Sequence, residues 1–369
     1  MAEPLKYIYH NTFLDTYASI LKKVIPELNE KKFRTQFNTK LWDDLELKQR
    51  MAFLTQATDD VLPNDLPSKI NALKNIIQRA NSNGAKDQNL EYIFLCDIIT
   101  QHGMEDLATC IPAIEMLTCF ISFEFAGRRF IQQHPEAMMA QMLLWTNHPN
   151  PNVRRYASEG CRPRLPWGLQ LKQFVIDPSP IIPILEKLKN DPSEYVLKSV
   201  ANNLNDISKD HPKLVIGILQ KWKKDASPRM IRLLKQAART LLKKGDKELL
   251  SLFGHHHHSP YVVEPVSWDK KSIHIGDKNI FQTTLTNSGK TQAEYRLEYF
   301  IYFVKANGLS SKKIFKIAEK TLHPGQSFTI QKSHTFADLT TRKHYPGTHQ
   351  ITIVINGQEG PHASFLLLL

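Results

Sequence analysis

The chain has 369 residues, 41% of them hydrophobic and 23% charged, a composition that excludes a disordered or collagen-like protein. Its 48 basic and 36 acidic side chains give a formal net charge of +12, and no apolar run approaches the roughly 20 residues of a membrane-spanning helix. Four cysteines without a CxxC pair indicate reduced thiols, so we expect a cytoplasmic protein with no metal and no cofactor.

The charge is unevenly distributed along the chain. Residues 1–126 hold 13 Lys/Arg and 17 Asp/Glu, whereas residues 127–254 hold 22 and 11. The first residues, MAEPLKYIYHNTF, lack the charged-then-apolar layout of a signal peptide. A middle third this basic favours a polyanionic partner, most simply nucleic acid.

The apolar segment FISFEFAGRRF contains a single carboxylate, Glu124. A carboxylate is costly to bury unless it is paired or functional. The local pattern favours Arg128, four residues further on, as a salt-bridge partner. The alternative is that Glu124 is a functional acid.

A degenerate repeat runs through the helical part of the chain. Similar segments begin at Asn147, Asn190 and Lys224, each with a polar, proline-containing turn followed by an amphipathic helix. Their offsets of 43 and 34 residues are typical of HEAT-type helix pairs, which stack into a curved solenoid with a concave surface. We therefore predict a mainly α fold, a HEAT-like α-solenoid, over residues 1–254.

The segment VRRYASEGCRPRLPW combines a helix with a rigid turn. Helical spacing places Arg155, Glu159 and Arg162 on one face, and two prolines then end the helix and stiffen an Arg-Pro-Arg-Leu-Pro-Trp turn. One interpretation is a salt-bridged helix end with Trp167 in the core. The other is a turn whose arginines, Arg164 included, bracket a phosphate backbone while the indole lies against a sugar or base.

The helix of the second repeat carries Asn202 and Asp206 one turn apart. Amides and carboxylates on a repeat helix are commonly just its exposed side. Taken alone, these two residues are therefore only weak candidates for a site.

The third repeat helix, RMIRLLKQAARTLLKK at 229–244, separates apolar and basic faces. Its basic face, the basic stripe, consists of Arg232, Lys235, Arg239 and Lys243. Most charged faces are merely solvated, but such faces normally mix signs, whereas residues 213–247 carry 11 Lys/Arg and only two acidic residues. We therefore favour contact with a nucleic-acid backbone.

The sequence changes character near residue 254. The stretch LFGHHHHSP contains Gly, Ser and Pro, and its consecutive histidines (His255 to His258) cannot all face one ion. We interpret residues 255–261 as an exposed linker, not as a metal site. Residues 262–369 then contain alternating segments, NIFQTTLTN, YRLEYFIYFV, SFTIQKSHTF and HQITIVIN, separated by turn signals. They predict an all-β, antiparallel immunoglobulin-like sandwich of about seven or eight strands.

Three motifs together resemble the AlkC-type alkylpurine DNA glycosylases, a HEAT-like-repeat family: ASEGCRPRLPW, EFAGRRF upstream of it and NNLNDISKDHP downstream. The resemblance covers residues 1 to about 254, including the start MAEPLK, and the sandwich resembles a domain that some members carry. It implies a base-excision enzyme that hydrolyses the N-glycosidic bond of 3-methyladenine and 3-methylcytosine in duplex DNA while the lesion stays in the helix. No Lys is an evident Schiff-base nucleophile, so a monofunctional glycosylase is expected.

The resemblance also implies roles for the residues above. An alkylated base is cationic and leaves readily, so the enzyme must mainly stabilise an oxocarbenium-like sugar and place a water molecule, which a carboxylate can do. The catalytic carboxylates would be Glu124, Asp206 and Glu159, the first two nearest the chemistry, and the lesion contacts Trp167 and Asn202. The expected phosphate contacts are basic: Arg155, Arg162, Arg164 and the basic stripe.

A second hypothesis is a non-catalytic HEAT scaffold that binds DNA or an acidic protein through the same charges. Its carboxylates would then only be salt-bridge partners. For the glycosylase we expect a monomer in the bacterial cytoplasm, at the nucleoid when acting, with double-stranded DNA containing alkylated bases as its partner and no membrane association.

Overall fold

The computed structural model describes residues 4–85, 88–256, 258–339 and 342–369. The chain divides into two compact units, Met1–Asp210 and His211–Leu369. Helices precede strands: the last helix ends at Leu252 and the first strand begins at Tyr261. Among the described residues, no helix has the length and apolar character needed to cross a membrane.

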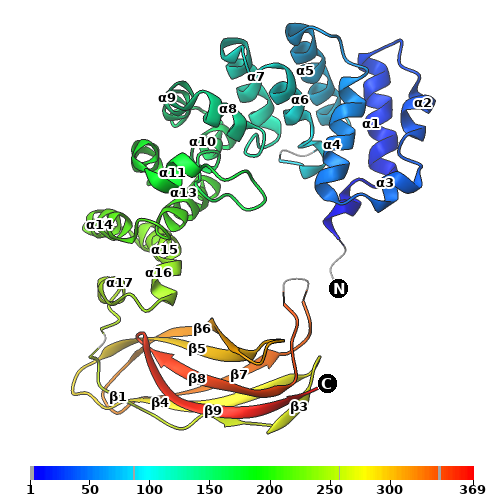
Figure 1. The fold of residues 1–369 in the computed structure, drawn as a ribbon. Coiled ribbons are helices and arrows are strands. Elements are labelled where there is room, and N and C mark those ends of the chain that lie inside the picture. Colours follow the sequence, from blue (N-terminus) through cyan, green and yellow to red (C-terminus); the bar gives the residue numbers. More distant parts are fainter. Residues whose placement is uncertain (1–3, 86–87, 257, 340–341) are drawn as a thin grey trace. The chain divides into compact units, whose positions relative to one another are not determined.

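The first unit is helical, and its helices follow one another along the chain in a curved row (Figure 1). The α-helices are α1 (Asn11–Val24), α2 (Glu30–Thr35), α3 (Lys40–Asp44), α4 (Leu47–Asp59), α5 (Leu66–Ser82), α6 (Leu95–His102), α7 (Leu107–Phe120), α8 (Gly127–Gln133), α9 (Pro135–Trp145), α10 (Pro151–Glu159), α11 (Lys172–Ile176), α12 (Ile182–Leu188) and α13 (Glu194–Ile207). Three short 3₁₀ helices accompany them: η1 (Leu5–Ile8), η2 (Leu90–Tyr92) and η3 (Ser179–Ile181).

Helices α10 and α13 pack against each other. Helix α10 begins with Pro at its first position, and the side chain of Asn150 accepts a hydrogen bond from the following turn. Its residues Val153 and Tyr156 are fully buried, as are Val200 and Leu204 of α13. This spacing of three or four residues turns one apolar face of each helix toward the other, so their polar faces emerge side by side.

The second unit begins with four helices: α14 (Pro212–Lys223), α15 (Pro228–Ala237), α16 (Arg239–Lys243) and α17 (Lys247–Leu252). Each of the three similar sequence segments thus contains a helix, namely α10, α13 and α15. The helix expected over 229–244 is interrupted, because Ala238 separates α15 from α16. The apolar face of this segment is buried as predicted, and Leu234 and Ala237 on it are fully buried.

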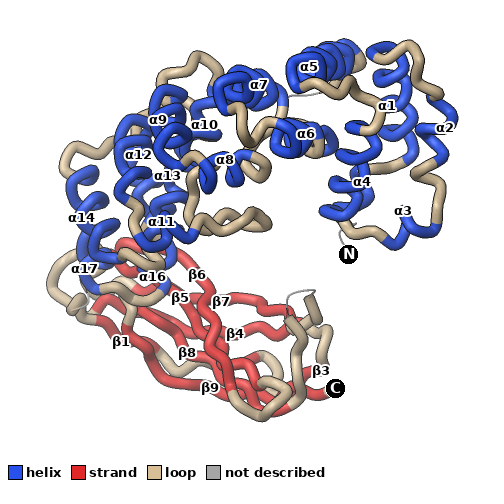
Figure 2. Tube along the Cα trace, turned by 45° about the horizontal axis from the view of Figure 1, so that its top comes forward, coloured by secondary structure: helices blue, strands red, loops and turns tan. Residues whose placement is uncertain are grey.

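The strands of the second unit form two sheets that enclose one core (Figure 2). The strands are β1 (Tyr261–Val263), β2 (Ser267–Trp268), β3 (Ser272–His274), β4 (Lys278–Asn287), β5 (Ala293–Val304), β6 (Ser310–Leu322), β7 (Ser327–Thr335), β8 (Gly347–Ile355) and β9 (Gln358–Leu368). One sheet joins β1, β2 and β7 to β4, and the other has the order β3-β9-β8-β5-β6.

The four strand segments expected from the sequence correspond to β4, β5, β7 and β8. One expectation is wrong: the sandwich is not wholly antiparallel, because β3 pairs with β9 in parallel. The chain crosses from one sheet to the other before β3, and a strand reached by a crossover need not run opposite to its neighbour as hairpin strands must. Between β6 and β7, Gly325 has φ +71°, a turn conformation that glycine adopts without strain.

The helices and the sandwich of the second unit are joined by a charged contact at Glu319 of β6. Its carboxylate pairs with Lys235 of α15 and, at 2.7 Å and 3.2 Å, with Lys316 and Arg296. Burial alone would raise the pKa of Glu319, but the two lysines lower it to about 2. His255 lies 3.8 Å from the same carboxylate and is only 1% exposed. The expectation of a wholly exposed linker is therefore wrong.

Candidate functional site

Five charged residues of the first unit form a continuous series of ion pairs, which we call the acid–arginine chain: Glu124, Arg155, Glu159, Arg162 and Asp206. Glu124 lies in the turn between α7 and α8, and Arg155 and Glu159 project from α10. Arg162 belongs to the turn after α10, and Asp206 to α13. Acidic and basic groups alternate, so each arginine lies between two carboxylates.

The contacts within the acid–arginine chain are short. Arg155 pairs with Glu124, and its Nη2 lies 3.3 Å from Oε1 of Glu159. Arg162 donates from Nη1 to the same Glu159 oxygen at 2.6 Å and from Nε to Oδ2 of Asp206 at 2.8 Å. The side chains are 3% to 16% exposed, so the pairs lie where water screens them weakly.

The three carboxylates differ in how many of their oxygens have a hydrogen-bond or ion-pair partner. Both oxygens of Glu159 are used, because Ser199 donates to Oε2 at 2.6 Å. Both oxygens of Asp206 are used as well, since Lys209 contacts Oδ1 at 2.9 Å. In Glu124 the hydrogen bond from Ser122 and the pair with Arg155 both fall on Oε2. Oε1 of Glu124 accepts no hydrogen bond from the described residues, and this side chain, at 16%, is the most exposed of the three carboxylates.

The arginines of the acid–arginine chain keep their charge. Burial would lower the pKa of Arg155 and of Arg162, but the neighbouring carboxylates, Glu159 foremost, outweigh it and raise both values. The guanidinium of Arg155 also lies over the ring of Tyr195, 4.9 Å from its centre. The two guanidinium groups therefore stay charged and are held in place by their partners, and a fixed arrangement of this kind can stabilise a developing charge without rearranging.

Arg128 fixes the turn after α10 through hydrogen bonds to its backbone. This residue is fully buried and donates to the backbone carbonyls of Leu169, Gly160 (2.9 Å) and Arg162 (2.7 Å). Burial without a carboxylate partner lowers the pKa of Arg128 to about 10. The local expectation that Arg128 pairs with Glu124 is thus wrong, because its guanidinium is used by three carbonyls and Arg155 takes Glu124 instead.

Trp167 lies at the end of this turn and is 62% exposed, so it does not belong to the core. Its φ of +61° is uncommon for a residue with a side chain and stores backbone strain. Lys48 of α4 donates to its carbonyl and Arg128 to that of Leu169, which holds the strained segment from both sides. The indole is therefore presented to solvent from a well-supported backbone.

The remaining predicted site residues lie at different distances from this centre. Arg164 makes a bidentate pair with Asp210, with both contacts at 2.8 Å. Asn202 lies half-buried on α13, one turn before Asp206. Its neighbour Asn203 is fully buried and donates to the Ser158 carbonyl at 2.7 Å, which ties α13 to α10.

The basic stripe belongs to the second unit. The expectation that it lacks acidic partners fails for Lys235, whose partner Glu319 comes from a distant part of the sequence. Arg232 and Lys243 are exposed and form no ion pair with any other described residue. Arg239 donates to the backbone carbonyl of Gln236 at 2.8 Å. Within the described ranges, no group of three or more potential ligands could hold a metal ion.

Sequence reasoning missed the residues that support the acid–arginine chain. Ser199 and Tyr195 lie seven and eleven residues before Asp206 on α13. Helical spacing places them on the same face as the predicted acid, a signal that could have identified them. Ser122 lies in the same turn as Glu124, two residues before it, whereas Lys48 supports the Trp167 carbonyl from α4 and had no such signal.

Comparison with known proteins gives consistent matches. A family model described as DNA alkylation repair enzyme matches residues 104–241, and one described as the C-terminal Ig-like domain of the uncharacterised protein YhaZ matches residues 262–369. The uncharacterised protein YhaZ of Bacillus subtilis (strain 168) is 38% identical over 96% of both chains.

The structure is also similar to that of the Pseudomonas fluorescens alkylpurine DNA glycosylase AlkC, which was solved bound to DNA containing an abasic site analog. The TM-score is 0.93 at 32% identity, and the match covers 100% of both chains. The chain therefore belongs to the AlkC-type family of DNA alkylation repair proteins that carry a C-terminal immunoglobulin-like domain.

Proposed function

We propose that the protein is a monofunctional DNA glycosylase that removes cationic alkylated bases, 3-methyladenine and 3-methylcytosine, from duplex DNA without flipping the base. The observation that carries the proposal is Oε1 of Glu124, an unoccupied carboxylate oxygen in an otherwise fully paired series of charges. The similarity to AlkC, whose solved complex contains abasic-site DNA, supports the same assignment.

Breaking the bond between sugar and base needs little help from a general acid, because the alkylated base is already cationic. The C1′–N bond breaks, its electron pair remains on the base, and the positive charge of the alkylated base is thereby lost. Glu124 stabilises the oxocarbenium-like sugar and accepts a proton from the water whose oxygen bonds to C1′. Asp206 is assigned as the second carboxylate near the sugar. Its partner Lys209 is 40% exposed, so this lysine can leave Asp206 and bind a phosphate instead.

Glu159 has a positioning role in this proposal. It lies between Arg155 and Arg162 and pairs with both guanidinium groups through Oε1, while Ser199 donates to Oε2 and fixes the carboxylate. These arginines, together with Arg164, hold the phosphates on either side of the lesion. Trp167 and Asn202 contact the deoxyribose or the lesion from the rim.

In this proposal residues 1–254 are the HEAT-like-repeat domain that binds the duplex. Residues 255–261 connect it to the sandwich of residues 262–369. Arg232 and Lys243 are the members of the basic stripe best suited to contact phosphates, since both are exposed and unpaired in the described structure. The protein acts as a monomer, because a single chain provides every proposed site residue.

The deciding experiment is the release of free 3-methyladenine from methylated duplex DNA, with enzyme in smaller molar amount than lesion. Repeated turnover by the natural chain, together with its loss in Glu124→Gln, is the expected result. If the chain binds the duplex but releases no base, the proposal is wrong and the non-catalytic scaffold is correct. Excision accompanied by strand cleavage at the abasic site would refute the monofunctional assignment.

A further inference from the structure

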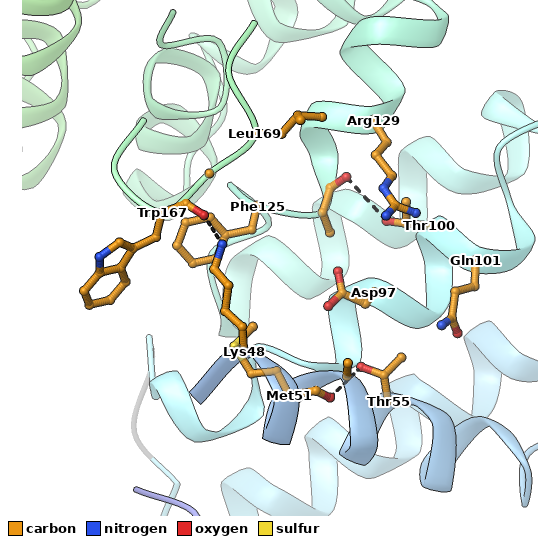
Figure 3. Close-up of a pocket in the computed structure, with 13 residues that line it drawn as sticks. Lys48, Met51, Thr55, Asp97, Thr100, Gln101, Phe125, Arg129, Trp167 and Leu169 are labelled. Atoms are coloured by element: carbon orange, nitrogen blue, oxygen red, sulfur yellow. Dashed lines mark hydrogen bonds between the residues drawn. The ribbon is translucent and has the colours of Figure 1, made fainter. Parts of the chain in front are cut away.

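A cavity lies in the first unit, and Phe125, the residue after Glu124, forms part of its lining. It has a volume of about 280 Å³ and opens between α4, α6, the start of α8 and the end of the Trp167 turn (Figure 3). Its floor is buried and mostly apolar or already hydrogen-bonded: Met51, Thr55, Thr100 and Ala126. Its rim is exposed and polar: Lys48, Gln101 and Arg129.

Asp97 is the unusual group of this cavity. Figure 3 shows its carboxylate in the middle of the lining residues, between the side chains of Lys48 and Arg129. It makes no side-chain hydrogen bond and no ion pair with any described residue, although it is half-buried. Burial raises the pKa of Asp97 to about 6, and the more distant charges of Arg129 and Lys48 offset this only in part.

The other polar groups of the floor are already satisfied. The hydroxyl of Thr55 contacts the carbonyls of Met51 and Phe94 at 3.0 Å, and that of Thr100 contacts the carbonyls of Cys96 and Ala126 at 3.4 Å. The carboxylate is therefore the acceptor that the floor offers to a ligand. A half-buried acceptor of this kind is matched by a donor N–H group.

The cavity suits a flat aminated ring better than an anion. A phosphate at the basic rim would be repelled by Asp97, whereas an exocyclic amine would donate to it while Arg129 donates to a ring nitrogen. The apolar surfaces of Phe125 and Met51 fit the faces of an aromatic ring. A volume of about 280 Å³ exceeds the roughly 150 Å³ of a cavity that holds benzene, which leaves room for a bicyclic base.

The cavity also lies next to the proposed chemistry. Phe125, which lines it, directly follows Glu124, and the backbone of Trp167 forms part of its margin. The indole of Trp167 is directed away from Asp97 in Figure 3, so it does not close the opening. The base stays in the duplex until its bond to the sugar near Glu124 has broken, and this cavity, lined in part by the same turn, can then receive it.

We propose that the cavity is a product site that holds the released, neutral aminopurine base before it leaves the enzyme. The inference rests on the proposed glycosylase activity and adds to it a preference for products with an exocyclic amine. After hydrolysis the electron pair of the broken C1′–N bond belongs to the base, which is then uncharged. Its amine donates to Asp97, and Arg129 holds the opposite edge.

The test measures calorimetric binding of two free bases to the full chain: 3-methyladenine and 3-methylpurine, which lacks the exocyclic amine. The natural chain should bind 3-methyladenine at least tenfold more tightly, because the amine then satisfies a half-buried carboxylate. In Asp97→Leu, which keeps the number and branching of the side-chain heavy atoms but removes the acceptor, the two affinities should agree within about threefold. Glu136→Gln, at an exposed position of α9, is the matched control and should leave the ratio unchanged.

Arg129→Gln provides a second variant if Asp97→Leu folds poorly, because Arg129 is exposed on the rim. It should weaken both bases severalfold and keep their ratio. Failure of both bases to bind at millimolar concentration would overturn the inference, as would an unchanged ratio in Asp97→Leu. Displacement of 3-methyladenine by inorganic phosphate would show an anion site and would overturn it as well.

Excision from methylated duplex DNA is measured in parallel to separate the two proposals. Normal excision without binding of the free base would refute the product site and leave the glycosylase assignment intact. Absence of excision by the natural chain would refute the glycosylase assignment. It would also refute the role of the cavity as a product site, which depends on that activity. Excision together with Asp97-dependent preference for 3-methyladenine supports both.

Discussion

Replacing Glu124 with Gln removes one negative charge at the most accessible carboxylate of the acid–arginine chain and changes the shape of the side chain little. Two unit charges about 4 Å apart interact by about 4 kcal/mol at an effective dielectric constant of about 20. Arg155, which pairs with this carboxylate, cancels part of the field at the sugar. We therefore expect a loss of about 3 kcal/mol of transition-state stabilisation, or roughly 150-fold in rate.

The assay is single-turnover release of 3-methyladenine from a methylated duplex, with enzyme in excess so that product release does not limit the rate. Binding to a duplex with an abasic-site analog should stay equal or become tighter, because Glu124→Gln makes the site more positive. Arg155 keeps Glu159 and the Tyr195 ring as partners, so the variant should lose only about 1–2 kcal/mol of unfolding free energy.

Glu136→Gln serves as the matched control, since it removes the same charge at an exposed position of α9. It should retain the full rate. A Glu124→Gln enzyme within threefold of the natural rate would refute the role of this carboxylate. Equal losses of rate and of DNA affinity would show instead that Glu124 only maintains the geometry of Arg155.

Three further predictions follow from other parts of the chain. Arg128→Met leaves three buried carbonyls of the turn without their donor, so urea denaturation should show a loss of about 3 kcal/mol in unfolding free energy, and excision should fall at least tenfold. Arg232→Ala should weaken binding to any duplex and reduce the slope of log affinity against log salt by about 1, whereas Lys235→Ala should mainly lower the melting temperature, since Lys235 already pairs with Glu319. Burial lowers the pKa of His334 in the sandwich to about 4 from an ordinary value near 6.5. Its neutral form is therefore favoured in the folded state, and unfolding free energy should fall by up to about 3 kcal/mol as pH drops from 6.5 to 4. Thermal unfolding checks this, and a His334→Gln variant with the same pH dependence would contradict it.

Local patterns in the sequence determined which side chains share one face of an element. Spacings of four and three residues placed Arg155 and Arg162 on either side of Glu159, and the structure joins both arginines to it. Alternation of apolar and polar residues likewise identified the longer strands of the sandwich, β4 and β5 among them. These features depend on backbone geometry within one element, which sequence spacing specifies directly.

Only the tertiary structure decided which elements meet. Glu124 pairs with Arg155 of α10 and not with Arg128 nearby, because Arg128 donates to carbonyls of the turn after α10 and packing brings Arg155 to Glu124. Lys235 is neutralised by a carboxylate of β6, far away in the sequence. Spacing along one helix contains no information about such partners, since they depend on how whole elements pack. The net charge of +12 pointed to a polyanion, but only the packing of whole elements left Oε1 of Glu124 without a hydrogen-bond donor among the described residues.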